Sequence, residues 1–357
     1  MIETDEQLSE FLARLRDAAW VAIDTEADSL HAYPEKLCLI QISIEGADVL
    51  IDPLAKLDLA PLWPVLHKHE LIFHGADYDL RLLRKNKNFV PTRIFDTMIA
   101  ARLLGETEFG LTNLVKNFLD VTLDKGPQKA DWAKRPLTER MANYARNDTL
   151  YLKSLSDILR AKLREAGRLA WVEQSCAQLI VDCGAPPPPD EEPWRIKGSA
   201  RFPPISLAVL REIWLWREKE AIAGNKPPYF VLSHEIVLSL AEAAGTSRSF
   251  AEMIPHHLSP RRKHDLEMAL ARGMAVAIQE QPKIFRSFSR RPTEVENRRF
   301  DQLKKTRDHI ATTLKLDPSL IAPKAMLAML AQDWAKHENQ MMPWQRELLL
   351  QHKQSQP

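Results

Sequence analysis

A run of four prolines divides this chain into two regions of different character. The run lies in the segment Gly184-Ala-Pro-Pro-Pro-Pro-Asp-Glu-Glu-Pro193. Consecutive prolines cannot continue a helix, and they favour an extended, semi-rigid spacer. Strand-like and helix-like patterns alternate before this run, whereas we find only helix-like patterns after it. A chain of 357 residues is also long enough for two or three domains, so we place a domain boundary here.

The region before the prolines has the pattern of an α/β domain. Thr4 and Gln7 form a capping box that predicts the start of a helix. One long helix is predicted from about Thr138 to Glu165. Short apolar and β-rich runs predict strands, the second and third joined as a hairpin, over residues 20–25, 37–44, 47–51, 71–73 and 94–95. This order of elements is typical of a mixed sheet flanked by helices.

The region after the prolines predicts two all-helical modules. Apolar residues at helical spacing begin near Leu207, and a basic connector precedes the last helical stretch. We therefore expect five segments, namely an α/β domain over residues 1–180, a Pro-rich linker over 184–200, a helical domain over 201–283, a basic connector over 284–297 and a second helical domain over 298–352.

The composition argues against a membrane protein and against a disulfide-stabilised secreted domain. The longest apolar stretch has seven residues, Ala325 to Ala331, whereas a membrane span needs ~20. The acidic N-terminus lacks the apolar core of a secretory signal. Cys38, Cys176 and Cys183 form neither a zinc spacing nor a disulfide framework. We expect a cytoplasmic protein with no membrane partner and no obligate protein partner.

Positive charge is concentrated in one part of the chain. Residues 258–307 contain thirteen Lys or Arg and six Asp or Glu, a net charge of +7, although the whole chain carries +1. Such a block predicts either an anionic partner or only a solvated helix surface. The best candidates for contacts to phosphates are six cations in this block, Arg290, Arg291, Arg298, Arg299, Lys304 and Lys305.

Two short motifs place acidic residues just after predicted strands. Asp24 and Glu26 end the first strand, and alternate strand side chains share a face. His74-Gly-Ala-Asp77-Tyr-Asp79 follows a later strand and enters a helix. Asp77 suits an ordinary acid at a helix N-terminus, while Asp79 lies further into a helix that must pack on the sheet. His74 is more often a structural hydrogen-bonding residue than a metal ligand at such a position.

A third motif lies in the predicted long helix. Tyr144 and Asp148 are four residues apart, so their side chains project from one face. Taken alone this pair suits a helix surface, but the three motifs together predict four converging carboxylates. Such carboxylates repel one another unless cations are bound, and hard oxygen ligands suit two Mg²⁺ or Mn²⁺ ions. Two such ions support phosphodiester hydrolysis, in which Tyr144 would orient or help deprotonate the attacking water.

These motifs resemble those of ribonuclease D, in the tyrosine subclass of the DEDD exonuclease superfamily. The matching segments are Asp24-Thr-Glu26-Ala-Asp-Ser-Leu-His31-Ala-Tyr33, His74-Gly-Ala-Asp77-Tyr-Asp79-Leu80 and Tyr144-Ala-Arg-Asn-Asp148. The resemblance implies a ribonuclease H-like α/β nuclease fold with a mixed sheet. It also implies 3′→5′ exonuclease chemistry that releases nucleoside 5′-monophosphates. The family's metal-binding acid in the second motif falls on Asp79, so the resemblance implies Asp24, Glu26, Asp79 and Asp148 as metal ligands, with Tyr144 as a further catalytic residue.

The helical region resembles the HRDC domain, a small helical bundle that binds nucleic acid. The resemblance is carried by Leu210-Arg-Glu-Ile-Trp214-Leu-Trp216-Arg217 and by Asn225-Lys-Pro-Pro-Tyr-Phe-Val-Leu-Ser233. Residues 298–350 resemble a second, degenerate copy. The expected substrate is therefore structured RNA with a single-stranded 3′ end, by resemblance a tRNA precursor. The alternatives are a DNA 3′→5′ exonuclease and a catalytically inactive RNA-binding protein.

Overall fold

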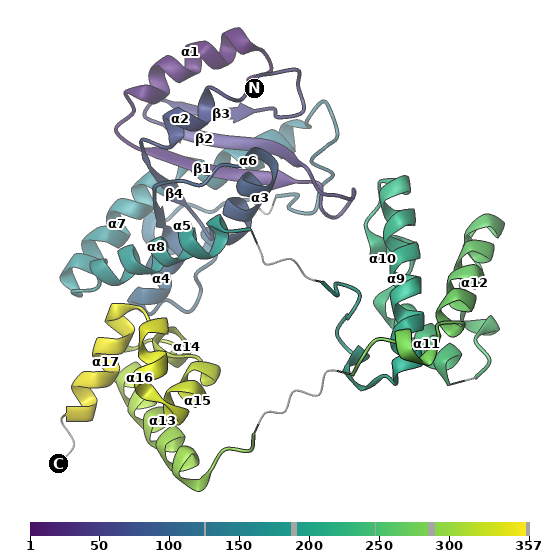
Figure 1. Cartoon of the computed structure of the whole chain (residues 1–357). Helices are drawn as coiled ribbons and strands as arrows, with labels where there is room; N and C mark the ends of the chain where they lie inside the picture. The colour runs from purple at the N-terminus through teal and green to yellow at the C-terminus, as the bar shows by residue number, and fades with distance from the viewer. Residues whose placement is uncertain (125, 187–190, 247, 285–289, 355–357) are drawn as a thin grey trace. The chain divides into compact units, whose positions relative to one another are not determined.

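The chain divides into two compact units in this computed structural model (Figure 1). The structure describes residues 1–124, 126–186, 191–246, 248–284 and 290–354, without the side chains beyond residue 350. Residues 187–190 of the predicted linker and 285–289 of the predicted connector therefore lie outside the described residues. The first unit is formed by residues 1–27, 37–186 and 290–357, and the second by residues 28–36 and 187–289.

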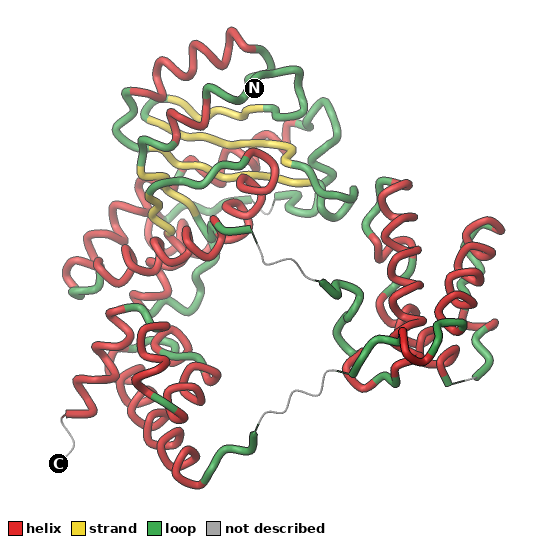
Figure 2. The backbone as a smooth tube through the Cα atoms, viewed as in Figure 1, coloured by secondary structure: helices red, strands yellow, loops and turns green. Residues whose placement is uncertain are grey.

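A five-stranded mixed sheet forms the centre of the first unit (Figure 2). The strands are β1 (Val21–Ala27), β2 (Leu37–Ile44), β3 (Ala47–Ile51), β4 (Glu70–Phe73) and β5 (Arg93–Asp96). They are ordered β3-β2-β1-β4-β5, with β2 and β3 antiparallel to their neighbours and β4 and β5 parallel to β1. The predicted mixed sheet and the predicted hairpin are confirmed.

Helices cover the sheet, and some of them carry residues of the sequence motifs described above. Those before the prolines are α1 (Asp5–Arg16), α2 (Leu62–Leu66), α3 (Asp77–Lys87), α4 (Thr97–Leu104), α5 (Leu111–Leu119), α6 (Glu139–Leu150), α7 (Leu152–Glu165) and α8 (Leu169–Gly184). The predicted capping box is present, since the side chain of Thr4 accepts from the backbone of Gln7. Helix α6 packs on β1, β2 and β3, whereas α8 packs on α3 and β5.

The prediction of a single long helix after Thr138 is wrong in one respect. The structure breaks it at Tyr151 into α6 and α7. The Thr149 hydroxyl donates back to the carbonyl of Arg146 and accepts a hydrogen bond from Ser43 on β2, 2.7 Å away. Threonine bonds of this kind disturb the regular helix. The break lets α6 follow the sheet while α7 packs against α4 and α5.

The second unit is a helical bundle with a core of its own. It contains α9 (Pro204–Gly224), α10 (Pro228–Val231), α11 (His234–Gly245) and α12 (Pro260–Met274). Its buried cluster includes Trp216, Leu240 and Leu270. Helices α9 and α12 pack along each other, and α11 packs against both.

The last helices of the chain belong to the first unit. They are α13 (Glu294–Leu314), α14 (Pro318–Ile321), α15 (Lys324–Gln332), α16 (Trp334–His337) and α17 (Pro343–Gln354). Their buried side chains join the main apolar cluster of the α/β fold, and α17 packs on α8. None of the described helices is both long and apolar enough to cross a membrane.

Candidate active site

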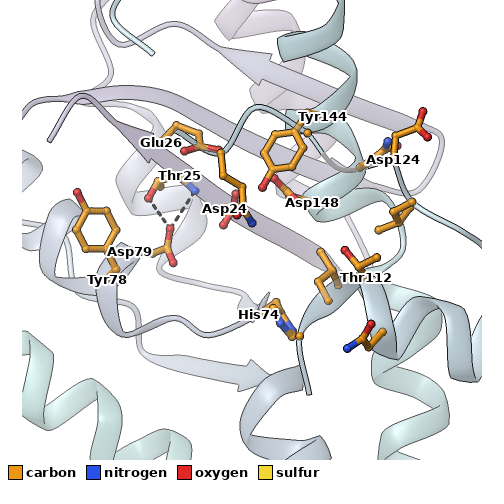
Figure 3. Close-up of a pocket in the computed structure, with 17 residues that line it drawn as sticks. Asp24, Thr25, Glu26, His74, Tyr78, Asp79, Thr112, Asp124, Tyr144 and Asp148 are labelled. Carbon is orange, nitrogen blue, oxygen red and sulfur yellow. Dashed lines mark hydrogen bonds between the residues drawn. The ribbon is translucent and has the colours of Figure 1, made fainter. Parts of the chain in front are cut away.

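The first two acids project from the end of β1 toward α6. Alternation along β1 places the side chains of Asp24 and Glu26 on one face, and Asp148 reaches them from α6. One carboxylate oxygen from each of the three lies within 4.8 Å of the others. Figure 3 shows the three side chains gathered at one side of the cavity. The strand and the helix therefore bring together residues that are more than a hundred positions apart in the sequence.

Asp79 lies beside this group, in the first turn of α3. Its side chain is 6% exposed, and its carboxylate accepts hydrogen bonds from both the backbone amide and the hydroxyl of Thr25 (Figure 3). Asp77, the other acid of the motif, is exposed and forms an ion pair with Arg81 at 2.9 Å. The structure thus turns Asp79 toward β1 and Asp77 toward solvent.

Tyr144 lies one helical turn before Asp148 on α6, and both side chains line the same cavity. Its ring is enclosed by the connection between α5 and α6. The Trp132 ring lies 6.1 Å from it, centroid to centroid, and Gln128 lines the same cavity as Tyr144. A Cβ added at Gly126 would lie 1.5 Å from a ring carbon of Tyr144, so only glycine fits there.

Burial and mutual repulsion disfavour ionised carboxylates in this cluster. Burial first, and then Asp148 and Asp79, raise the pKa of Glu26 to about 9. Burial raises the pKa values of Asp79 and Asp148 to about 7. For Asp24, burial and then the three neighbouring carboxylates raise the pKa well above its ordinary value. A cation placed among these oxygens would oppose these shifts, because it stabilises the ionised forms of the carboxylates.

The acids line one side of a cavity of about 750 Å³. Other parts of its wall are His74 after β4, the N-terminus of α5 around Thr112, and the connection that carries Asp124 (Figure 3). The cavity is large enough to admit a nucleotide. Its carboxylates can hold divalent cations, and its phenol can orient a water molecule.

All five residues expected from the sequence meet in this cavity, which is lined by Asp24, Glu26, Asp79, Tyr144 and Asp148. Sequence reasoning missed the residues that hold them in place. Thr25 bonds to Asp79, while Gly126 lies against the ring of Tyr144 and Gln128 lines the cavity beside it. A threonine between two acids was a visible signal for the first. Gly126 and Gln128 gave no signal in the sequence, because their position beside α6 depends on the path of a loop.

The six cations proposed for nucleic-acid contact lie on or just before α13, apart from the motifs of the acid cluster in the sequence. Arg290 forms two hydrogen bonds with the carboxylate of Glu296, and Arg298 lies 3.8 Å from Glu294. The other four are exposed: Arg291, Arg299, Lys304 and Lys305. Within the basic block at least six arginines have a carboxylate within 4 Å: Arg261, Arg262, Arg272, Arg290, Arg298 and Arg307. Much of the block's charge is thus already neutralised within the protein.

Comparison with known sequences agrees with this geometry. The profile of the 3′-5′ exonuclease family matches residues 1–164, and that of the HRDC domain matches residues 206–263. Ribonuclease D of Gluconacetobacter diazotrophicus is 35% identical over 269 residues, which are 71% of this chain and 68% of the relative. Ribonuclease D of a Jannaschia species is 33% identical over 300 residues, 79% of this chain and 76% of the relative.

Solved structures extend the similarity to the whole fold. The crystal structure of Escherichia coli RNase D, described as an exoribonuclease involved in structured RNA processing, superposes with a TM-score of 0.75 at 24% identity. The superposition covers 99% of this chain and 98% of the other. At this identity the match supports the fold, including the helical regions after the prolines.

Proposed function

The chain belongs to the ribonuclease D family and is a metal-dependent 3′→5′ exoribonuclease, and we propose that it matures the 3′ ends of structured RNA, tRNA precursors in particular. The observation that supports this most directly is the convergence of four carboxylates and a phenol in one cavity. Hydrolysis there would release nucleoside 5′-monophosphates one at a time. We place the enzyme in the cytoplasm, where such precursors are made.

The donor set of the cavity fits hard divalent cations. Asp24, Glu26 and Asp148 offer carboxylate oxygens within 4.8 Å of one another, and Asp79 adds a fourth carboxylate beside them. Oxygen donors alone, without histidine or cysteine among them, suit Mg²⁺ or Mn²⁺. We propose two ions per site, held by these four acids. When bound, such ions activate a water and stabilise the leaving oxygen of a phosphodiester.

The protein's own contribution is to position the reacting groups. Burial and the Asp148 charge raise the pKa of Tyr144 above the ordinary phenol value, so its hydroxyl keeps its proton at neutral pH. A neutral hydroxyl beside Asp148 can orient the attacking water through a hydrogen bond. Thr25 fixes the rotamer of Asp79, and thereby the direction in which that acid offers its free oxygen.

Two alternatives are separated by one digestion experiment. Purified enzyme would be given a 3′-extended tRNA or a DNA strand of the same sequence, with Mg²⁺ or Mn²⁺, and products would be read at single-nucleotide resolution. We expect stepwise shortening of the RNA tail that slows at the folded body. Equal or faster digestion of the DNA would favour the DNA exonuclease, and binding without digestion would indicate an inactive RNA-binding protein.

The ligand assignment is tested by a matched pair of substitutions on one helix. Asp79→Asn should abolish hydrolysis, because one negative ligand is lost while the amide oxygen can still accept from Thr25. Asp77→Asn should be nearly silent, since that carboxylate faces Arg81 at the surface. Removing a carboxylate from a repulsive cluster should also raise the melting temperature of the metal-free protein at pH 8. More than a tenth of the activity left in Asp79→Asn at saturating metal would exclude Asp79 from the site.

A further inference from the structure

His74 lines the acid-cluster cavity but does not belong to the acid cluster. It follows β4 directly, and no histidine is part of the carboxylate group found among the described residues. In Figure 3 the His74 ring is drawn apart from Tyr144, below Asp24 and Asp148 in this view. The side chain is half-buried and lines the cavity.

Hydrogen-bond counting fixes which nitrogen of His74 carries the proton. Its Nδ1 lies 2.9 Å from the Thr97 hydroxyl oxygen, and that hydroxyl donates to the carbonyl of Phe73 at 3.0 Å. A hydroxyl has one hydrogen, and a carbonyl can only accept. Both bonds therefore form only if Thr97 accepts from His74, which places the proton on Nδ1.

The second ring nitrogen is then a hydrogen-bond acceptor facing the cavity. Burial lowers the pKa of His74, although Asp96 opposes this, so the ring is neutral at physiological pH and has a single N–H. Nε2 consequently carries a lone pair. Among the residues that the structure describes, none forms a hydrogen bond to Nε2, and this atom is absent from the buried polar atoms without partners. It is thus accessible from the cavity.

Because Nε2 is a hydrogen-bond acceptor, it can form hydrogen bonds only with groups that donate a hydrogen. A neutral Nε2 cannot bind a phosphate oxygen of the substrate, because both are acceptors, but it can accept from a hydroxyl. Nucleotides offer such donors on the ribose, and the 2′-hydroxyl is the one that distinguishes RNA from DNA. Resting on the exoribonuclease function proposed above, we propose that His74 Nε2 accepts a hydrogen bond from the 2′-hydroxyl of the 3′-terminal nucleotide. Thr97 is the positioning residue that holds the required tautomer.

The test measures whether the enzyme's preference for a 2′-hydroxyl on the substrate depends on His74. Three short RNAs would be compared, namely an unmodified strand, one with a 2′-deoxy 3′-terminal nucleotide and one with a 3′-deoxy 3′-terminal nucleotide. The value of kcat/KM for removal of that nucleotide would be measured with wild type, His74→Phe and His74→Gln. Each preference is a ratio taken within one variant, so loss of folded enzyme cancels. Wild-type digestion of the unmodified RNA separately tests the exoribonuclease function.

We expect wild type to prefer the unmodified end over the 2′-deoxy end by roughly three- to tenfold, the effect of about one hydrogen bond. His74→Phe should reduce this ratio to about one, whereas His74→Gln, which keeps an acceptor, should retain part of it. Thr97→Val should lower the ratio and Thr97→Ser should restore it. The 3′-deoxy ratio should be the same in all variants. An active enzyme whose 2′-deoxy ratio is unchanged in His74→Phe would overturn the inference, as would a change confined to the 3′-deoxy ratio.

Discussion

The two helical regions that follow the proline run differ in where they bury their apolar side chains. Helices α9 to α12 bury Trp216 in a core formed among themselves. Helices α13 to α17 instead bury Trp344 in the core of the α/β fold, where its ring stacks on Trp171 at 4.9 Å. Similarity of two segments to one kind of bundle therefore does not determine whether each is an independent folding unit.

The contact between the last helices and the nuclease fold is specific. The two outer nitrogens of Arg168 donate to the carbonyls of Leu103 and Leu314, both at 2.9 Å, and so connect the C-terminal ends of α4 and α13. Gly105, just beyond α4, lies against the Lys315 carbonyl. These contacts brace α8, which packs on α3, the helix that carries Asp79. We expect α13 to α17 to support the catalytic domain, and α9 to α12 to be dispensable for its stability.

The largest expected effect follows deletion of one helical region or the other. Truncation after residue 289 exposes the α8 surface and should destabilise the nuclease fold by more than the ~3–5 kcal/mol of a single buried tryptophan. Replacement of residues 187–289 by a flexible Gly/Ser linker should leave its unfolding midpoint nearly unchanged. For both proteins, the midpoint would be measured as the temperature at which digestion of a short single-stranded RNA is lost. Equal midpoints for the truncated and the full-length chain would contradict this difference.

A matched pair of tryptophans sharpens the same comparison. Trp344 and Trp216 are 2% and 6% exposed, so each substitution by alanine should cost ~3–5 kcal/mol in its own unit. Trp344→Ala should lower the temperature at which activity on short RNA is lost. Trp216→Ala should lower only the unfolding temperature of the second unit, which calorimetry would detect. The temperature at which activity on short RNA is lost should stay the same. If Trp216→Ala inactivated the enzyme at the same lowered temperature, the two units would not unfold independently.

The sequence predicted the site better than it predicted these long-range contacts. The strand end at Asp24 and the helical spacing of Tyr144 and Asp148 are local patterns, and the resemblance to the family selected Asp79 over Asp77. Periodicity shows which face of a helix is apolar but not which surface will cover it. For this reason the packing of α17 on α8 was not foreseen. The domain boundaries placed beyond the prolines remain predictions.

Two glycines give a smaller, well-controlled effect. Gly105 has a φ of +95°, and an added Cβ would lie 2.4 Å from the Lys315 carbonyl oxygen. Gly167 has a φ of +67° with nothing within 4 Å of its Cβ position. Gly167→Ala should cost only the left-handed backbone penalty, about 1–2 kcal/mol. Gly105→Ala should cost measurably more in denaturant unfolding, because the α4 and α13 ends must separate. Equal costs would show that this close approach is not important for stability.

The smallest expected effect concerns the RNA contacts of the two regions. We propose that the exposed cations of α13, which have fewer carboxylate partners than those near α12, contact the phosphates of the RNA body. Lys304→Ala and Lys305→Ala together should then reduce the salt slope of tRNA binding by about 1.4–1.8, since each phosphate contact contributes about 0.7–0.9. The control pair Lys56→Ala and Lys68→Ala removes equal charge from the connection between β3 and β4. Binding would be measured over a salt series with Ca²⁺ in place of Mg²⁺ to limit cleavage. If both pairs lowered the slope equally, net charge alone would explain the effect. If neither did, the α13 cations would be only a solvated surface, and the RNA contacts would have to lie elsewhere.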